Sequence, residues 1–161
     1  MDKEEFTKGV LAAEKSLYYV AKSILRNDED CADAMQNAIL SAYSSLHTLR
    51  QEAYFKTWLT RILINECYKM LRDRKSEISY EEYMEHEEAE TSGADTGVFD
   101  EVLKLAEQYR VPFVLHYIEG YQVKEIAEML HTTEGSIKTR LYRSRNLLKK
   151  RLKGELGYEA Y

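Results

Sequence analysis

A stretch near the middle of the chain, residues 76–101, contains ten acidic side chains and no Lys or Arg. Its sequence, SEISYEEYMEHEEAETSGADTGVFDE, has no apolar stripe at the 3.6-residue spacing of a helix and includes Gly93 and Gly97. Such a segment repels itself and buries too little apolar surface to offset the entropy lost on ordering. It therefore predicts a linker, and the chain is expected to fold as two small modules on either side of it.

Helical spacing dominates both flanking parts. One proline and seven glycines in 161 residues are too few for a turn-rich β fold, and apolar residues recur at steps of three and four. We expect an all-α protein with two small helical domains, residues 1–75 and 99–156, joined by an acidic flexible linker at residues 76–98. Cys31 and Cys67 fall in helical apolar patterns, which favours reduced, buried thiols over a disulfide framework.

The N-terminal module is predicted to contain three helices, the first ending near Asn27 and Asp28. Its inward face comprises Phe6, Val10, Ala13, Leu17, Val20, Ala21 and Ile24. The second helix follows an acidic cluster at residues 28–30 and turns inward Met35, Ile39, Ala42, Tyr43 and Leu46. The third helix starts near Tyr54 and turns inward Phe55, Leu59, Ile62, Leu63, Cys67, Met70 and Leu71.

The outward side of this third helix mixes basic, amide and aromatic groups. Its members are Lys56, Arg61, Asn65, Lys69 and Arg72, with Tyr54 and Trp58 near its start. Basic groups interleaved with aromatic rings can hold a nucleic-acid backbone and stack an unpaired base. A solvated charged face, with Trp58 in the core, explains the same pattern.

The C-terminal module begins with two short predicted helices. Phe99, Val102, Leu103 and Ala106 belong to the first; Phe113, Val114, Tyr117 and Ile118 form the apolar side of the second. The second is expected to carry Pro112 in its first turn, because a deeper proline removes a backbone hydrogen bond, and to stop at Gly120.

A helix-turn-helix follows. Val123, Ile126, Ala127 and Leu130 form one apolar face, and Ile137, Leu141, Leu148 and Leu152 form another. A polar turn separates them, with Thr133 as the N-cap of the second helix. Between Gly135 and Gly154 there are eight Lys or Arg and no carboxylate, although the formal net charge of the protein is -5. Because such a run repels itself unless a polyanion offsets it, this helix is expected to bind DNA.

Two stretches in this order resemble the extracytoplasmic-function (ECF) group of bacterial RNA polymerase sigma factors. The first is DCADAMQNAILSAYSSL followed by FKTWLTRILINECYKMLRDRK, and the second is YRVPFVLHYIEGYQVKEIAEMLHTTEGSIKTRLYRSRNLLKK. The resemblance covers nearly the whole chain. It implies a factor that binds the polymerase core and directs promoter-specific initiation, with region 2 at residues 1–75 and region 4 at residues 99–156.

The resemblance also implies roles for particular residues. Polymerase binding falls on Asp30, Asp33, Gln36 and Asn37, where Asn37 replaces an acid that the family often has. The minus-ten element is assigned to His47, Arg50, Lys56, Trp58, Arg61 and Asn65, with the connection 47–54 capturing a flipped base. The minus-thirty-five element is assigned to Ser136, Lys138, Thr139, Arg140, Arg143 and Arg145.

Two departures from the family pattern lie in the helix-turn-helix. Gln122 stands where the family usually has a capping Ser, and His131 stands where a Gly often makes the turn. Because His tolerates a left-handed backbone less well than Gly, a less tight turn is expected.

The linker has a second interpretation besides a disordered spacer. In the family this segment threads toward polymerase channels built for polyanions, so an acidic tether is suited to imitate RNA there. Under this hypothesis, replacing Glu85, Glu87, Glu88 and Glu90 by Gln weakens holoenzyme formation or alters early transcript release.

Other function classes remain as alternatives. A helix-turn-helix regulator that acts without polymerase would share the basic helix but has no reason to possess the helix around Gln36. An enzyme is disfavoured, since the sequence has no phosphate loop, H-E-x-x-H, C-x-x-C or nucleophile elbow, and we expect no metal, cofactor or small-molecule substrate. The absence of an apolar leader or spanning segment favours a cytoplasmic protein. The family further implies an anti-sigma factor partner, often tethered to a membrane.

Overall fold

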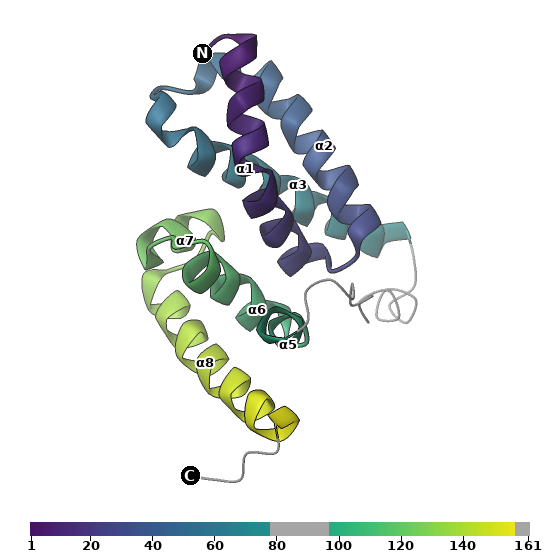
Figure 1. Cartoon of the computed structure of the whole chain (residues 1–161), viewed down its shortest axis with the longest axis vertical. Helices are drawn as coiled ribbons and strands as arrows, with labels where there is room; N and C mark the ends of the chain where they lie inside the picture. The colour runs from purple at the N-terminus through teal and green to yellow at the C-terminus, as the bar shows by residue number, and fades with distance from the viewer. Residues whose placement is uncertain (78–96, 157–161) are drawn as a thin grey trace. The chain divides into compact units, whose positions relative to one another are not determined.

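The computed structural model describes residues 1–77 and 97–156, and within these ranges every regular element is a helix (Figure 1). The chain divides into two compact units, Met1–Glu90 and Thr91–Tyr161. The all-α prediction is thus confirmed. Most of the predicted linker, residues 78–96, lies outside the described residues, as do the four glutamates of the RNA-mimic hypothesis.

The N-terminal unit is a bundle of three helices: α1 (Lys3–Leu25), α2 (Asp28–Ser44) and α3 (Phe55–Glu77). α1 begins with a capping box, in which the Asp2 carboxylate accepts from the Glu5 N–H at 2.8 Å and the Glu5 carboxylate accepts from the Asp2 N–H at 3.1 Å. α1 ends where Arg26 adopts a φ of 70°. The Asn27 side chain then accepts from the Asp30 N–H, so Asn27 starts the second helix rather than ending the first.

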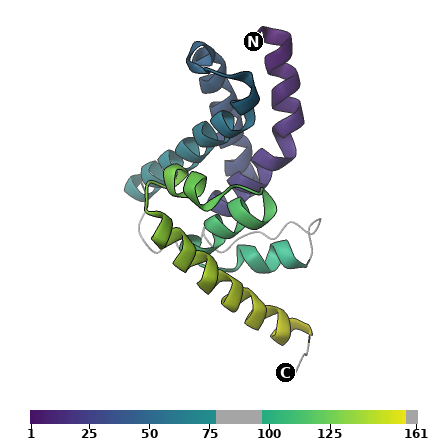
Figure 2. The same cartoon turned by 90° about the vertical axis from the view of Figure 1, so that its left-hand side faces the viewer.

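Two 3-10 turns, Leu46–Thr48 and Glu52–Tyr54, connect α2 to α3. They lie at the end of the bundle that also holds the start of α1 (Figure 2). The connection contributes no buried residue to the core, as its polar sequence predicts. It remains available for a partner at this end of the unit.

The buried faces of α1 and α3 largely match their predicted stripes, but that of α2 does not. The buried apolar residues of α2 are Cys31, Ala34, Ala38 and Ala42. The predicted Tyr43 is 48% exposed, and Leu46 belongs to the following turn. Small side chains on the inward face let α2 approach both α1 and α3. The buried face of α2 is therefore the one that allows close packing, not the one with the largest apolar side chains.

Cys31 and Cys67 are both free and buried, as predicted. Burial raises the pKa of the Cys31 thiol to about 12, and it raises the pKa of Cys67 as well. Because the thiolate is the reactive form, neither cysteine is suited to chemistry in the folded protein.

The C-terminal unit contains α5 (Val98–Leu103), α6 (Glu107–Phe113), a π-helical segment η3 (Val114–Ile118), α7 (Val123–Met129) and α8 (Glu134–Leu156). Arg110 is buried and donates to the Leu105 carbonyl at 2.9 Å, which satisfies a backbone acceptor just beyond α5. Glu101 of α5 is paired with Arg151 of α8 at 2.9 Å. These contacts join the first helices of the unit to the last.

Two predictions about the second helix of this unit were wrong. Pro112 lies near the end of α6, not in its first turn, because the helix begins earlier, at Glu107. A π-helical segment follows directly, in which the Glu119 N–H donates to the Val114 carbonyl five residues earlier at 3.0 Å. The wider turn also rotates the apolar side, so Tyr117 and Ile118 are 44% and 39% exposed instead of buried.

Candidate functional surfaces

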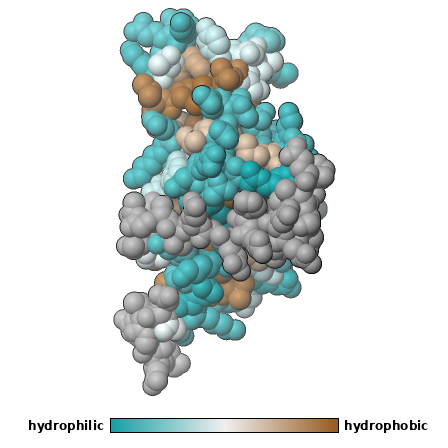
Figure 3. Space-filling view, turned by 90° about the vertical axis from the view of Figure 1, so that its right-hand side faces the viewer, coloured by the Kyte–Doolittle hydropathy of each residue, from teal (hydrophilic) through white to brown (hydrophobic). Residues whose placement is uncertain are grey.

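The outward side of α2 carries three of the four predicted polymerase-binding residues. Asp33, Gln36 and Asn37 are all exposed there. Leu40 follows at the same helical spacing and is 64% exposed. We call Asp33, Gln36, Asn37 and Leu40 the α2 crest. On the side of the N-terminal unit that carries α2, hydrophobic surface gathers near one end (Figure 3).

Sequence reasoning missed Leu40 because it sought apolar residues only for the core. The sequence did contain a signal, which is the position of Leu40 around the helix. Leu40 falls outside the buried stripe of Ala34, Ala38 and Ala42 and four residues beyond Gln36. A large apolar side chain surrounded by polar ones on an exposed helix face is the composition expected at the centre of a protein interface.

Asp30, the fourth residue predicted to bind polymerase, does not lie on this exposed face. Asp30 is only 6% exposed. Its two carboxylate oxygens accept from the guanidinium of Arg74, with Oδ1 at 2.7 Å from Nη2, and Oδ2 also accepts from the Asn27 amide. This two-point interaction between Asp30 and Arg74 connects the start of α2 to the end of α3. A carboxylate held in this way has a structural role.

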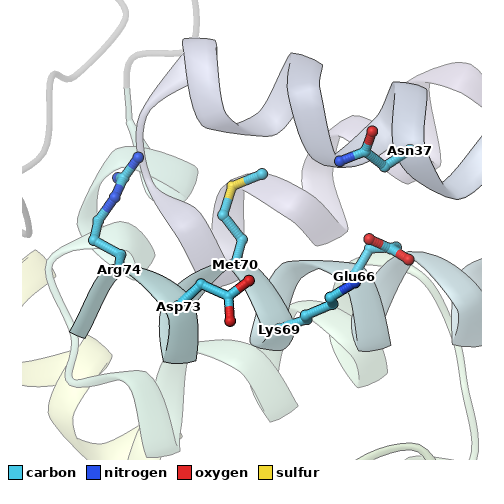
Figure 4. Close-up of a pocket in the computed structure, with 6 residues that line it drawn as sticks. All are labelled: Asn37, Glu66, Lys69, Met70, Asp73 and Arg74. Carbon is cyan, nitrogen blue, oxygen red and sulfur yellow. The ribbon is translucent and has the colours of Figure 1, made fainter. Parts of the chain in front are cut away.

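A polar pocket of about 230 Å³ lies beside the α2 crest, between α2 and α3 (Figure 4). Met70 reaches from α3 toward α2 in its middle, and Asn37 borders it from the α2 side. The α3 residues around it are Glu66, Lys69, Asp73 and Arg74. The crest and this pocket are thus continuous at Asn37.

Three of the predicted minus-ten residues form one line along α3. Trp58, Arg61 and Asn65 follow at steps of three and four, on the side opposite the buried Leu59, Leu63 and Cys67. We call Trp58, Arg61 and Asn65 the α3 stripe. Trp58 is half-buried, with its ring 5.9 Å from that of Phe55, so it contributes to the core while keeping one side accessible.

The remaining three minus-ten residues lie off this stripe. Lys56 is exposed in the first turn of α3. It precedes Trp58 by two residues, which places the two side chains roughly 200° apart around the helix. His47 and Arg50 are exposed in the connection that precedes α3. The structure therefore brings together three of the six residues as a line and places the others around its beginning.

The helix-turn-helix is formed by α7 and α8, as the sequence predicted. The Thr133 hydroxyl caps α8 by accepting from the Ser136 N–H at 3.1 Å. The Glu125 carboxylate accepts from the Gln122 N–H at the start of α7. In the turn between the helices His131 adopts a φ of 55°, a left-handed conformation that glycine adopts without strain.

Buried residues of α8 divide its basic side chains between two flanks. Ile137, Leu141, Ser144 and Leu148 form the buried seam. At 3.6 residues per turn, Lys138 and Arg145 fall on one flank, and Arg140 and Arg143 on the other, with Thr139 between them. The six predicted minus-thirty-five residues thus surround the exposed side of α8 rather than forming a single row.

Arg145 is engaged within the protein. Its Nη1 donates to the Tyr117 hydroxyl, and its guanidinium lies 5.9 Å from the Tyr117 ring centre and 5.8 Å from that of Tyr142. A guanidinium over aromatic rings is stabilised by the ring electrons. Arg145 therefore connects α8 to the π-helical segment, a role that its basic character alone did not indicate.

Glu101 holds two cations at the other flank of α8. Its carboxylate accepts from Lys104 and from Arg151, each at 2.9 Å. Burial alone would raise the pKa of Glu101, but the hydrogen bonds and charges of Lys104 and Arg151 outweigh it, so this pKa lies below its ordinary value of 4.5. One of the eight basic residues of α8 is thereby neutralised inside the unit.

Residues 1–77 and 97–156 contain neither a metal-binding cluster nor a membrane-spanning helix. In these ranges no group of three or more His, Cys, Asp or Glu is arranged to hold a metal ion. None of the helices described there is long and apolar enough to cross a membrane.

Comparison with protein families assigns both units. A family described as Sigma-70 region 2 matches residues 10–77, and one described as Sigma-70, region 4 matches residues 100–148. The ECF RNA polymerase sigma factor SigW of Bacillus subtilis is 30% identical, over 94% of this chain and 91% of its own length. The RNA polymerase sigma factor SigV of the same organism is 29% identical, over 96% and 98%.

Solved structures share the fold. The sigma factor RpoE, in complex with the anti-sigma factor NepR from Bartonella quintana, superposes with a TM-score of 0.75 at 21% identity, over 93% of this chain and 98% of that one. CnrH, in complex with the cytosolic domain of CnrY, gives a TM-score of 0.67 at 22% identity, over 95% and 90%.

Proposed function

The chain belongs to the ECF group of RNA polymerase sigma factors, and on this premise we propose which of its surfaces perform the function of the group. It binds the polymerase core and directs promoter-specific initiation of transcription. The α2 crest is proposed to bind the core. The α3 stripe and the connection 47–54 bind the minus-ten element, and α8 binds the minus-thirty-five element.

The observation that carries this proposal is the coexistence of two different surfaces in one chain. The α2 crest presents Leu40 among polar groups, which suits a protein partner, while α8 presents basic groups without a carboxylate between Gly135 and Gly154, which suits DNA. A helix-turn-helix regulator acting without polymerase would need only the second surface, and the family matches do not favour it.

Each surface has a distinct physical task. Exposed Lys and Arg on α8 neutralise phosphates and release counterions, which gives affinity, while short polar groups such as Ser136 and Thr139 can reach base edges. On α3, half-buried Trp58 offers a ring, and Arg61 and Asn65 offer donors to a strand whose bases are unpaired. Binding the separated strand more tightly than the duplex favours promoter melting without any covalent step.

We extend the proposal to regulation and location. In the two solved structures compared above, the sigma factor RpoE is in complex with the anti-sigma factor NepR, and CnrH is in complex with the cytosolic domain of CnrY. By analogy, this chain is proposed to be held by a protein inhibitor that covers its polymerase-facing and promoter-facing surfaces. It is proposed to act in the cytoplasm, to be held at the membrane when that inhibitor is tethered there, and to require no cofactor or small-molecule substrate.

Run-off transcription with purified core polymerase tests the function. We expect promoter-specific products from a library of genomic fragments only when the chain is added to the core. No specific product from any fragment would contradict the proposal. Promoter fragments recovered here also supply the DNA for the experiments below.

Substitution of Leu40 tests the assignment of the α2 crest. Because Leu40 is exposed, Leu40→Asp should leave the fold intact but place a charge at the centre of the interface, weakening core binding by about tenfold or more. Leu11→Asp is the matched control, since Leu11 is also 64% exposed but lies on α1. Equal core affinity for both variants and the unsubstituted protein would rule out the crest.

A further inference from the structure

Asn146 is an exposed amide on α8 that has no role in the folded unit. It lies outside the buried seam of α8, and within residues 1–77 and 97–156 its side chain makes no hydrogen bond. Asparagine is also a poorer helix former than alanine, so its presence in the middle of a long helix does not stabilise that helix. The amide carries two donor hydrogens and one acceptor oxygen. These groups are therefore available to a ligand.

Asn146 continues the line of α8 that faces away from the core. It follows Thr139 by seven residues, or about two turns, so the two side chains lie on the same side, opposite the buried seam. α8 is one unbroken helix from Glu134 to Leu156 (Figure 1). Along such a helix, seven residues correspond to about 10 Å. Thr139 and Asn146 thus mark the two ends of a straight line on the exposed side.

Basic side chains lie on both sides of Asn146. Lys149 is exposed on the flank that carries Lys138. Lys150 is exposed on the other flank, which carries Arg143. Because the phosphates of two strands border the major groove, cations on both flanks suit its edges, while the line between them faces the bases. The uncharged amide of Asn146 therefore lies where a helix in the groove would present a base-reading group.

The interval between Thr139 and Asn146 is one that groove-reading helices use. In homeodomains, one long helix reads the major groove with residues at steps of three and four, spread over about seven positions. Base pairs follow each other at about 3.4 Å along the duplex, so a line of about 10 Å spans about three of them. A helix of this length that lies along the groove thus extends its reading beyond its first turns.

We propose that Asn146 reads an adenine of the minus-thirty-five element, about three base pairs from the base that Thr139 reaches. This inference rests on the proposed function and adds a base-reading residue beyond the six assigned to that element. In the major groove the amide N–H donates to adenine N7, and the amide oxygen accepts from the N6 amine. Guanine presents an oxygen in place of that amine, which leaves the amide oxygen without a donor, so adenine is preferred.

The test uses holoenzyme and a duplex promoter fragment recovered by run-off transcription. Each A·T pair of the minus-thirty-five element is replaced in turn by G·C. With the unsubstituted protein, we expect one such replacement to weaken binding by about tenfold through loss of the contact with Asn146. Asn146→Ala should bind the original fragment about tenfold more weakly and be indifferent to that one replacement. Placing 7-deazaadenine, which lacks N7, at the same position should weaken binding of the unsubstituted protein but not of Asn146→Ala.

Controls separate base reading from folding and from the proposed function. Alanine favours a helix more than asparagine does, so Asn146→Ala should not unfold α8. Gln108→Ala, which removes an exposed amide from α6, is the matched control and should keep every base preference. If Asn146→Ala binds all fragments as the unsubstituted protein does, or more weakly by one common factor, the inference is overturned and the proposed function stands. If the unsubstituted holoenzyme shows no base preference anywhere in the minus-thirty-five element, the proposed function is contradicted instead.

Discussion

The arginines of α8 share one helix but have different surroundings. Arg145 donates to the Tyr117 hydroxyl and lies over two tyrosine rings, and Arg151 is paired with Glu101. Arg143 is exposed on the flank away from Tyr117. A phosphate that approaches Arg145 must compete with these contacts, but one that approaches Arg143 meets a solvated guanidinium.

We therefore predict unequal effects of two alanine substitutions. Arg143→Ala should lower affinity for duplex minus-thirty-five DNA by about tenfold and reduce the slope of log affinity against log salt by about one. Arg145→Ala should change the slope less, and it should lower the thermal stability of the C-terminal unit by removing contacts between α8 and η3. Filter binding over a salt series, with circular dichroism melting of each variant, distinguishes the two. Equal slopes for both variants would show that Arg145 also contacts DNA.

At the scale of elements, the packing of α1 on α3 depends on one glycine. A Cβ at Gly9 would lie 2.5 Å from Cε1 of the Phe55 ring, well inside van der Waals contact. Phe55 is buried and in ring contact with Phe6 and Trp58, so it has little room to move. The close approach of these helices therefore requires a residue without a side chain at this position.

Gly9→Ala is accordingly expected to destabilise the N-terminal unit despite improving helix propensity. The propensity gain is about 1 kcal/mol, whereas overpacking a tight core costs about 1–3 kcal/mol, so a net loss of about 1 kcal/mol is expected. Fluorescence of Trp58, the only tryptophan, reports this unit during urea unfolding. Gly154→Ala, where nothing lies within 4 Å of the added Cβ, is the control and should not destabilise the protein. A midpoint for Gly9→Ala at or above that of the unsubstituted protein would show that Phe55 moves aside.

At the scale of the whole molecule, the negative net charge does not show which carboxylates form ion pairs in the folded protein. The formal net charge of -5 includes ten acids in residues 76–101, of which Glu101 is paired in α5. In the N-terminal unit, the Lys22 amine and the Tyr18 hydroxyl hydrogen-bond to Asp28, and chiefly through Lys22 they hold the pKa of this carboxyl below its ordinary value. Each unit thus contains a carboxylate whose charged form is favoured by folding.

This arrangement predicts acid sensitivity in a defined direction. Because the folded-state pKa of Glu101 lies below 4.5, its stabilisation is complete above about pH 4.5 and is lost as pH falls through the lower folded-state pKa. Melting temperatures from pH 7 to pH 3 should fall more steeply for the unsubstituted C-terminal unit than for Glu101→Gln. Calorimetry of the full chain measures this difference, with Glu134→Gln, at an exposed position of α8, as the comparison. Parallel curves for the unsubstituted protein and Glu101→Gln would show that the pairing does not contribute to folding.

Much of this architecture could be predicted from residue spacing. The stripe of α1 from Phe6 to Ile24, the cap at Thr133 and the helix-turn-helix follow from local periodicity and short-range hydrogen bonding, which depend little on distant parts of the chain. The placement of Asp33, Gln36 and Asn37 on one exposed face follows for the same reason. The charge of α8 already indicated a polyanionic partner.

Contacts between elements decided the rest. Asp30 has no sequence neighbour that indicates burial, yet Arg74, 44 residues away, holds it. Arg145 is likewise engaged by Tyr117, 28 residues away. Leu40 looked like an ordinary helix residue until the alanine face of α2 left it outside the core. The sequence by itself determined which helices form and which partners their charges suit, because those depend on neighbours along the chain. Tertiary structure alone decided which individual side chains remain free to bind, because that depends on which distant residues pack against them.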